Sequence, residues 1–119
     1  MGSKNIPHVT QYSVSKELTP DTDYAGATAT DGADHVVDVR CMYNKAFLIQ
    51  NTGATTISYK ILASMDEGAN YDVTDTSEAT LTAGAQIVKT STGNYTHMKL
   101  QVKSAGATSV TSKVVTSTN

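Results

Sequence analysis

The sequence offers few residues that could do chemistry, and one of them is its single cysteine, Cys41. A cysteine acts as a nucleophile when a nearby base or cation lowers the pKa of its thiol. Cys41 instead lies in a predicted strand, His35 to Tyr43, whose alternate residues share one face: Val37, Val39, Cys41 and Tyr43. Because a buried free cysteine usually behaves as a small apolar side chain, we expect Cys41 in the core.

The three histidines, His8, His35 and His97, lack the sequence spacing of a zinc-binding pair. Serine is abundant, so a Ser–His–Asp combination could be assembled by chance, but no G-x-S-x-G motif or comparable context supports one. His97 lies beside Lys99 on the polar side of a predicted strand, where we expect it to face solvent or a partner. We therefore predict no catalytic residue, no metal ligand and no cofactor.

Oxygen-bearing side chains gather between Asp66 and Asp72 and could in principle hold calcium. Gly68 comes too early for the calcium-loop pattern, so a polar β-turn is the better interpretation. The pairs Asp21/Asp23 and Asp31/Asp34 are interpreted in the same way.

The six tyrosines stand against one phenylalanine and no tryptophan, which indicates a binding surface because tyrosine combines apolar area with a polar tip. Tyr59 is assigned to the core by its position in a strand. The candidate partner-binding residues are two from the N-terminal segment and four tyrosines in or near loops: Lys4, Ile6, Tyr12, Tyr24, Tyr71 and Tyr95.

The elements that must position these side chains are predicted to be short β-strands. Phe47 to Asp72 is predicted to form a hairpin around a turn at 51–54. Alternation in its second strand places three residues on one face: Ile57, Tyr59 and Ile61. The segment 95–103 alternates in the same way, with Met98, Leu100 and Val102 inward and His97, Lys99, Gln101 and Lys103 outward.

The remaining segments are an edge strand at 9–15, a long loop from Leu18 to Asp34, a polar link at 75–80, and strands at 86–90 and 110–115. About seven to nine short strands without a helical period predict an all-β antiparallel sandwich or a jelly-roll-like fold. Residues 9–119 are expected to form one domain, preceded by an extended arm at 1–8, because Pro7 disfavours a helix start. The long loop is expected to be functional or ordered by a partner.

Composition excludes several classes of function. Charged residues make up 17% of the chain and the net charge is −2, so there is no basic surface for nucleic acid. No apolar run approaches the roughly 18 residues of a membrane span, and the N-terminus lacks the apolar segment of a signal peptide. One cysteine forms no internal disulfide, which fits synthesis in a reducing cytoplasm.

Five stretches resemble small virion proteins of tailed bacteriophages: Phe47–Gly53, Ile57–Ser64, Asp66–Asp72, Leu81–Ala85 and Lys99–Lys103. These proteins are short, all-β chains rich in Thr, Ala and Gly. The resemblance covers residues 45–104 and implies a β-sandwich that coats or completes a capsid, or lies in the neck or tail.

The resulting hypothesis is a non-enzymatic capsid decoration or cement protein, located in the virion. Its partners would be the major capsid protein or other virion proteins, and it could form a homo-oligomer. The alternative is a neck, tail or fibre module that binds a cell-surface glycan, with Tyr24, Tyr71 and Tyr95 supplying stacking faces. A small hydrolase is kept as a third class, for which His97 and Cys41 would be tested.

Overall fold

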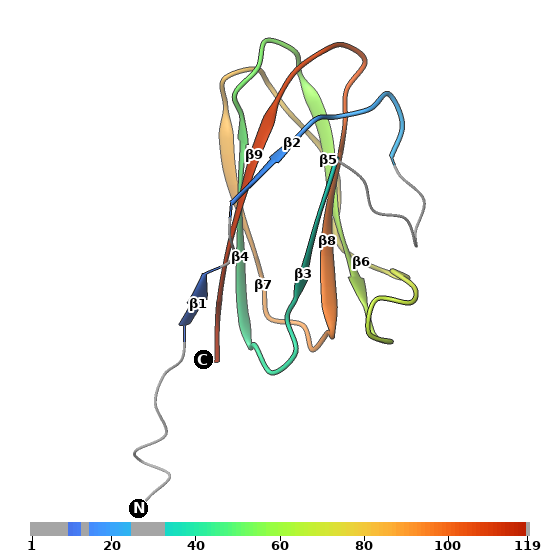
Figure 1. Cartoon of the computed structure of the whole chain (residues 1–119), viewed down its shortest axis with the longest axis vertical. Helices are drawn as coiled ribbons and strands as arrows, with labels where there is room; N and C mark the ends of the chain where they lie inside the picture. Colours follow the sequence, from blue (N-terminus) through green and yellow to red (C-terminus); the bar gives the residue numbers. More distant parts are fainter. Residues whose placement is uncertain (1–9, 13–14, 25–32, 119) are drawn as a thin grey trace, which may run out of the picture.

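The computed structural model describes residues 10–12, 15–24 and 33–118, which form nine β-strands in two antiparallel sheets and no helix (Figure 1). Sheet A contains β1 (Thr10–Tyr12), β2 (Lys16–Leu18), β9 (Val110–Ser117), β4 (Asn44–Asn51) and β7 (Gln86–Ser91). Sheet B contains β3 (Asp34–Asp38), β8 (His97–Lys103), β5 (Ile57–Ser64) and β6 (Val73–Leu81). The prediction of an all-β sandwich is confirmed.

The strand pairs are nested in sequence, so that strands near the two ends of the chain pair with each other and the central strands pair last. β2 pairs with β9, β3 with β8, β4 with β7, and β5 with β6. The chain is therefore one long antiparallel hairpin that is rolled up, so that successive pairs fall alternately in sheet A and sheet B. This nested pairing is the jelly-roll topology.

The predicted hairpin over Phe47–Asp72 is wrong in its first half, because β4 and β5 belong to different sheets. Residues 52–56 instead carry the chain across the sandwich. Asn51 is 1% exposed, and its Nδ2 donates hydrogen bonds to the carbonyl oxygens of Thr55 and Leu81 at 2.8 and 3.0 Å. These bonds satisfy a buried amide at the crossover. The second half, β5 to β6, is the hairpin around which the sequence folds.

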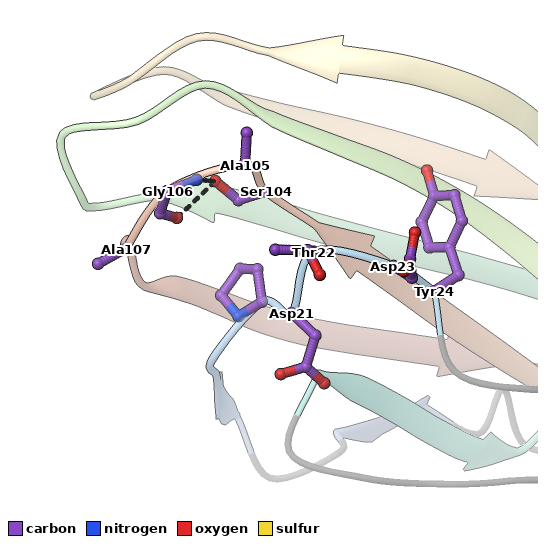
Figure 2. Close-up of a pocket in the computed structure, with 9 residues that line it drawn as sticks. Asp21, Thr22, Asp23, Tyr24, Ser104, Ala105, Gly106 and Ala107 are labelled. Carbon is purple, nitrogen blue, oxygen red and sulfur yellow. Dashed lines mark hydrogen bonds between the residues drawn. The ribbon is translucent and has the colours of Figure 1, made fainter.

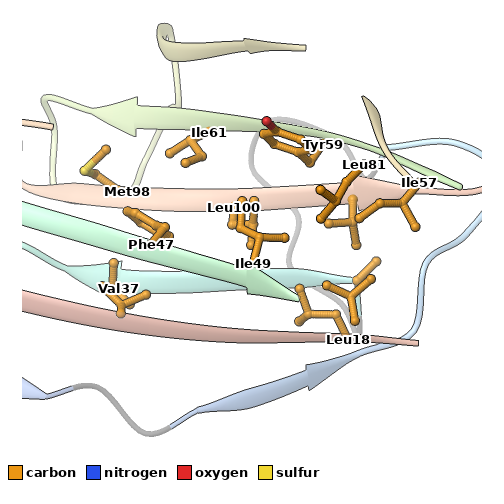
Figure 3. Packing of buried hydrophobic residues seen from close by; sticks show 14 of the residues in the cluster. Leu18, Val37, Phe47, Ile49, Ile57, Tyr59, Ile61, Leu81, Met98 and Leu100 are labelled. Atoms are coloured by element: carbon orange, nitrogen blue, oxygen red, sulfur yellow. The ribbon is translucent and has the colours of Figure 1, made fainter. Parts of the chain in front are cut away.

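The core lies between the sheets and is filled by alternate residues from strands of both sheets (Figure 3). Phe47 and Ile49 of sheet A meet Tyr59, Ile61 and Leu100 of sheet B, each at most 1% exposed. The two predicted sets at 57–61 and 98–102 are confirmed as inward-facing. Burying a side chain of this size contributes about 1.5–3 kcal/mol, so the alternation in sequence is the main determinant of the sandwich.

The polar link predicted at 75–80 is wrong, since these residues are the middle of strand β6. Among the described strands, β6 pairs only with β5, so it is an edge strand of sheet B. One side of an edge strand faces water, where Thr, Ser and Glu are well accommodated. Its register with β5 shifts between Tyr59 and Leu62, which marks a bulge.

The prediction that Cys41 is buried is also wrong. β3 ends at Asp38, and the Asp38 carboxylate accepts a hydrogen bond from the backbone N–H of Arg40 at 3.0 Å. The chain then turns, with the N–H of Met42 bonded to the carbonyl oxygen of Val39 at 3.1 Å. Cys41 lies in this turn at φ 64° and is exposed. The alternation of buried and exposed side chains that includes Val37 therefore ends before Cys41.

Within the predicted edge strand at 9–15 the structure describes β1, which pairs with β9 at the end of the strand order of sheet A. A further short strand, β2, follows at Lys16–Leu18 and also pairs with β9. The N-terminal arm at 1–8 and residues 25–32 of the long loop lie outside the described residues.

Candidate interaction surfaces

Tyr24 lies on the outer side of sheet B, where residues 20–24 cross its strands. The Tyr24 hydroxyl donates a hydrogen bond to Glu78 Oε2 at 2.8 Å. The ammonium groups of Lys60 and Lys103 lie 4.3 and 4.8 Å from the centre of the Tyr24 ring. Burial, followed by Glu78, raises the pKa of Tyr24, so the phenol remains a protonated donor. One tyrosine thus contacts β5, β6 and β8.

Tyr71, in the connection between β5 and β6, covers the same side of sheet B. Its ring centre is 4.5 Å from Lys99 Nζ, and Lys99 Nζ is 3.9 Å from Asp34 Oδ2. Tyr71 is 6% exposed, Asp34 1% and Lys99 0%. Lys99 and Gln101 lie on the outer side of β8, as the alternation predicts, but both are buried because that side is covered. Burial raises the pKa of Tyr71, with Asp34 contributing further.

Tyr95 lies in the connection between β7 and β8. Its hydroxyl donates to Asp75 Oδ1 at 3.2 Å, and Lys45 Nζ is 5.5 Å from its ring centre. Lys45 is 1% exposed and also donates a hydrogen bond to the carbonyl oxygen of Gly93. Burial lowers the pKa of Lys45, and the Asp75 carboxylate opposes that effect. Burial raises the pKa of Tyr95.

The three clusters share one composition, a tyrosine ring, at least one lysine ammonium and a carboxylate. Each cluster holds a connecting segment against the sandwich through cation–π and charged contacts. The Tyr71 ring is buried, so it is not exposed for the expected contact with a partner. Tyr24 and Tyr95 are half-buried, and lysines occupy space above their rings.

The structure does not bring the predicted partner-binding residues together into one site. Lys4 and Ile6 lie outside the described residues. Tyr12 ends β1, where it pairs with Val115 of β9 in sheet A. Tyr24 and Tyr71 belong to the outer side of sheet B. Their role in binding a partner remains a prediction.

One histidine forms a contact that the sequence did not indicate. His35 Nδ1 and Ser112 Oγ are 2.7 Å apart, linking β3 of sheet B to β9 of sheet A. The two residues are 77 positions apart, and both are buried, at 6% and 0% exposure. Burial, followed by Lys16, lowers the pKa of His35. This contact joins the sheets inside the core, where a substrate would have no access to the serine.

The acidic turn after β5 is held by its own hydrogen bonds. Asp66 Oδ1 accepts from Ser64 Oγ at 2.7 Å, and Asp66 Oδ2 accepts from Asn70 Nδ2 at 3.0 Å. These bonds, led by Asn70, lower the pKa of Asp66 to about 2. The geometry is that of a polar turn. Within the described residues, no three His, Cys, Asp or Glu side chains are placed to hold a metal ion.

An open groove of about 650 Å³ lies at one end of the sandwich, between residues 20–24 and the turn 104–107 (Figure 2). Ser104 Oγ donates to the carbonyl oxygen of Gly106 at 2.8 Å and stiffens the turn. The opposite wall carries the carboxylates of Asp21 and Asp23 and the Tyr24 ring. Neither histidine nor cysteine is among the described residues that line this groove, and the hydrogen bond to Gly106 engages the hydroxyl of Ser104.

The outer face of sheet A is open, in contrast to that of sheet B. Val88 of β7 is 56% exposed and Val115 of β9 is 38% exposed. Leu48 of β4 is half-buried and lies opposite Val88 in the register. A hollow of about 310 Å³ adjoins this strip and is lined by residues of β4, β7 and β9: Asn44, Lys45, Ala46, Thr90, Val115, Thr116 and Ser117. This face was missed from the sequence, because each exposed valine resembles a strand residue of the core.

No described residue belongs to a helix that is long and apolar enough to cross a membrane. No protein-family model matches the chain, and no curated protein matches its sequence.

Several solved structures share the fold. A pilus protein of Bacillus endospore appendages aligns with a TM-score of 0.59 and 11% identity, over 92% of this chain and 86% of that chain. The K1 cleaved adhesin domain of Lys-gingipain from Porphyromonas gingivalis W83 aligns with a TM-score of 0.55 and 12% identity, over 92% of this chain and 97% of that chain. The SPBc2 prophage-derived protein YomS aligns with a TM-score of 0.50 and 15% identity, over 88% of this chain and 96% of that chain. At these identities the likeness establishes the fold alone.

Proposed function

We propose that the chain is a bacteriophage virion structural protein, a capsid decoration protein that binds the head surface and bridges capsid subunits without catalysing a reaction. The difference between the two outer faces carries this proposal. The chain's own tyrosine and lysine side chains cover sheet B, whereas sheet A presents exposed aliphatic residues on its outer face. In this proposal, that exposed apolar strip is the surface that contacts another protein.

The structural neighbours support an assembly role. One is a component of pili, one is an adhesin domain and one is derived from a prophage. The resemblance of residues 45–104 to small phage virion proteins points to the same class.

Binding would depend on repetition over the capsid lattice. In this proposal residues 9–119 are the sandwich domain, and the arm at 1–8 reaches a neighbouring subunit. The long loop was expected to be functional or ordered by a partner, but Tyr24 in its first part is held by sheet B. Many weak contacts then act together, since a second contact on the same lattice benefits from a high effective concentration.

The alternative of a neck, tail or fibre module that binds glycan has less support. Its three stacking tyrosines are each paired with lysine, and Tyr71 is buried. The groove beside Tyr24 remains the place where such a ligand would bind.

The experiment that tests the proposal uses heads of the phage that encodes this chain, produced with its gene deleted. Purified protein is added, the heads are sedimented, and their melting temperature is measured. We expect co-sedimentation that saturates in proportion to the number of shell subunits, and a higher melting temperature. Absence of co-sedimentation with unchanged melting would contradict a capsid role, and saturation at a few copies would point to the neck or tail.

A further inference from the structure

We propose that the outer face of sheet A is the surface through which this protein docks, and that its occupant is a capsid subunit with an apolar patch and a carboxylate. The contact residues are Leu48, Val88, Val115 and Lys113. The inference rests on the proposed function, because that function names the shell as partner.

The aliphatic residues form a continuous strip across three strands. Leu48 lies between Val88 of β7 and Lys113 of β9 in one row, and Ala46 lies beside Val115 in the next row. Directly opposed residues of an antiparallel sheet point to the same face, with Cβ atoms about 4.5–5.5 Å apart. The strip is therefore one surface.

The strip reaches the edge of sheet A at β7. Among the described strands β7 pairs only with β4, so it is an edge strand. Its outward residues are Gln86, Val88 and Thr90, and none of them is charged. Its one charged residue, Lys89, alternates with them and is half-buried on the other face. On its outer face β7 therefore presents no charge to a partner.

The charges on this face indicate what the partner carries. Lys113 is exposed and makes no ion pair with any residue in the described part of the chain. The nearby Glu17 carboxylate accepts a hydrogen bond from Thr111 Oγ1 at 2.7 Å. A carboxylate of the partner opposite Lys113 would form an ion pair with it, and complementary charges of this kind fix the orientation of two proteins in a complex. The hollow beside Val115 would receive a partner side chain.

The size of the face decides between a shell and a second copy of this chain. The apolar strip covers two rows of outward residues on three strands. With strands about 4.8 Å apart and about five residues along each at about 3.4 Å, the footprint of this strip is on the order of 250 Å². Stable complexes of free proteins bury about 800 Å² on each partner. The patch is too small to hold two free copies together, but it is sufficient as one repeated contact on a lattice.

Two variants on the face and one matched control test the inference. Val88→Glu and Lys113→Glu place a negative charge on the face. Thr80→Glu places the same charge at an exposed position of β6 in sheet B. Each variant is first checked for an unchanged unfolding midpoint, which is expected because all three positions are exposed. Binding to heads lacking this protein is then measured by co-sedimentation.

We expect wild-type protein and Thr80→Glu to bind equally, and each face variant to bind at least about tenfold more weakly. If Val88→Glu and Lys113→Glu both bind heads as tightly as wild-type protein, the docking face is overturned while the decoration role stays intact. Failure of wild-type protein to bind heads would overturn both. A concentration-dependent dimer in sedimentation velocity that Val88→Glu abolishes would show a second copy on this face and overturn the assigned occupant.

Discussion

The side chains of Lys99 and Asp34 lie 3.9 Å apart, Nζ to Oδ2, at 0% and 1% exposure. In the register of β3 and β8, Asp34 is opposite Gln101 and Lys99 is opposite Val36, so the pair is diagonal on the outer side of sheet B. The cost of removing two charges from water is comparable to their attraction inside a protein. The pair is therefore expected to matter chiefly when one member is lost.

Replacing Lys99 with methionine removes the ammonium beside the Asp34 carboxylate while keeping the length of the side chain. We expect a loss of roughly 3–5 kcal/mol in the free energy of unfolding, because a buried carboxylate loses its counter-charge. Urea unfolding measures the loss. Lys113→Met, at an exposed position, is the control and should change stability little. Similar midpoints for the two variants would contradict a structural role for the ion pair.

Gly53 is needed at the crossover from sheet A to sheet B because another segment approaches it closely. A Cβ at this position would lie 1.9 Å from Thr108 Oγ1 and 2.7 Å from the Ser109 backbone nitrogen. Gly53→Ala is expected to cost roughly 1–3 kcal/mol, since backbone must shift to relieve the overlap. Gly106→Ala is the matched control, where the nearest atoms are at 3.4 Å. Thermal unfolding of both variants is compared. Equal midpoints would show that the backbone at 52–56 shifts without cost to accept the added Cβ, which would contradict the need for glycine.

The sequence predicted the class of fold because alternation of apolar residues is local. Ile57, Tyr59 and Ile61 share a face whichever strand they pair with, so their burial was predictable. Pairing depends on distant residues, and β4 and β5 therefore resembled a hairpin although they lie in different sheets. β6 was missed because an edge strand needs few apolar residues.

The candidate surfaces were less predictable than the fold. Tyr24, Tyr71 and Tyr95 were expected to contact a partner, and nothing in the sequence indicates which lysine lies over each ring. Lys99 alternates with core residues and would be exposed to solvent in an uncovered sheet. Its burial follows from the segments that cover sheet B, which only the folded arrangement shows. Val88 was not distinguishable from a core valine.

The lowered pKa of His35 predicts a dependence of stability on pH. Burial and Lys16 hold the pKa of His35 below its ordinary value of 6.5, so the unfolded chain binds more protons just below that pH. The contribution to stability is fully present above about pH 6.5 and falls as pH drops toward the folded-state pKa. Hydrogen bonds from Arg40 and Asn70 lower the pKa values of Asp38 and Asp66 from 3.8 to about 2, so these groups affect stability only at lower pH.

The free energy of unfolding is measured in urea at about pH 7.5 and about pH 5.5. We expect wild-type protein to be less stable at the lower pH, and His35→Gln to show a smaller difference between the two values. The comparison within each variant removes any general loss caused by the substitution. An equal pH dependence for wild-type protein and His35→Gln would show that another group is responsible.

Cys41 combines exposure with a left-handed backbone, and both features can be tested. At φ 64° a side chain crowds the following carbonyl group, which glycine avoids. Cys41→Gly is expected to stabilise the fold by about 0.5–1 kcal/mol, despite the extra freedom that glycine gives the unfolded chain.

Ala69→Gly, at an exposed turn position without a positive φ, is the control and should destabilise. Thermal unfolding distinguishes the two variants. In native wild-type protein, a thiol-specific reagent should modify Cys41 as completely as in urea, because the turn keeps the sulfur in solvent. A thiol that reacts only after unfolding, together with a destabilised Cys41→Gly, would show that β3 continues past Asp38 and buries Cys41 after all.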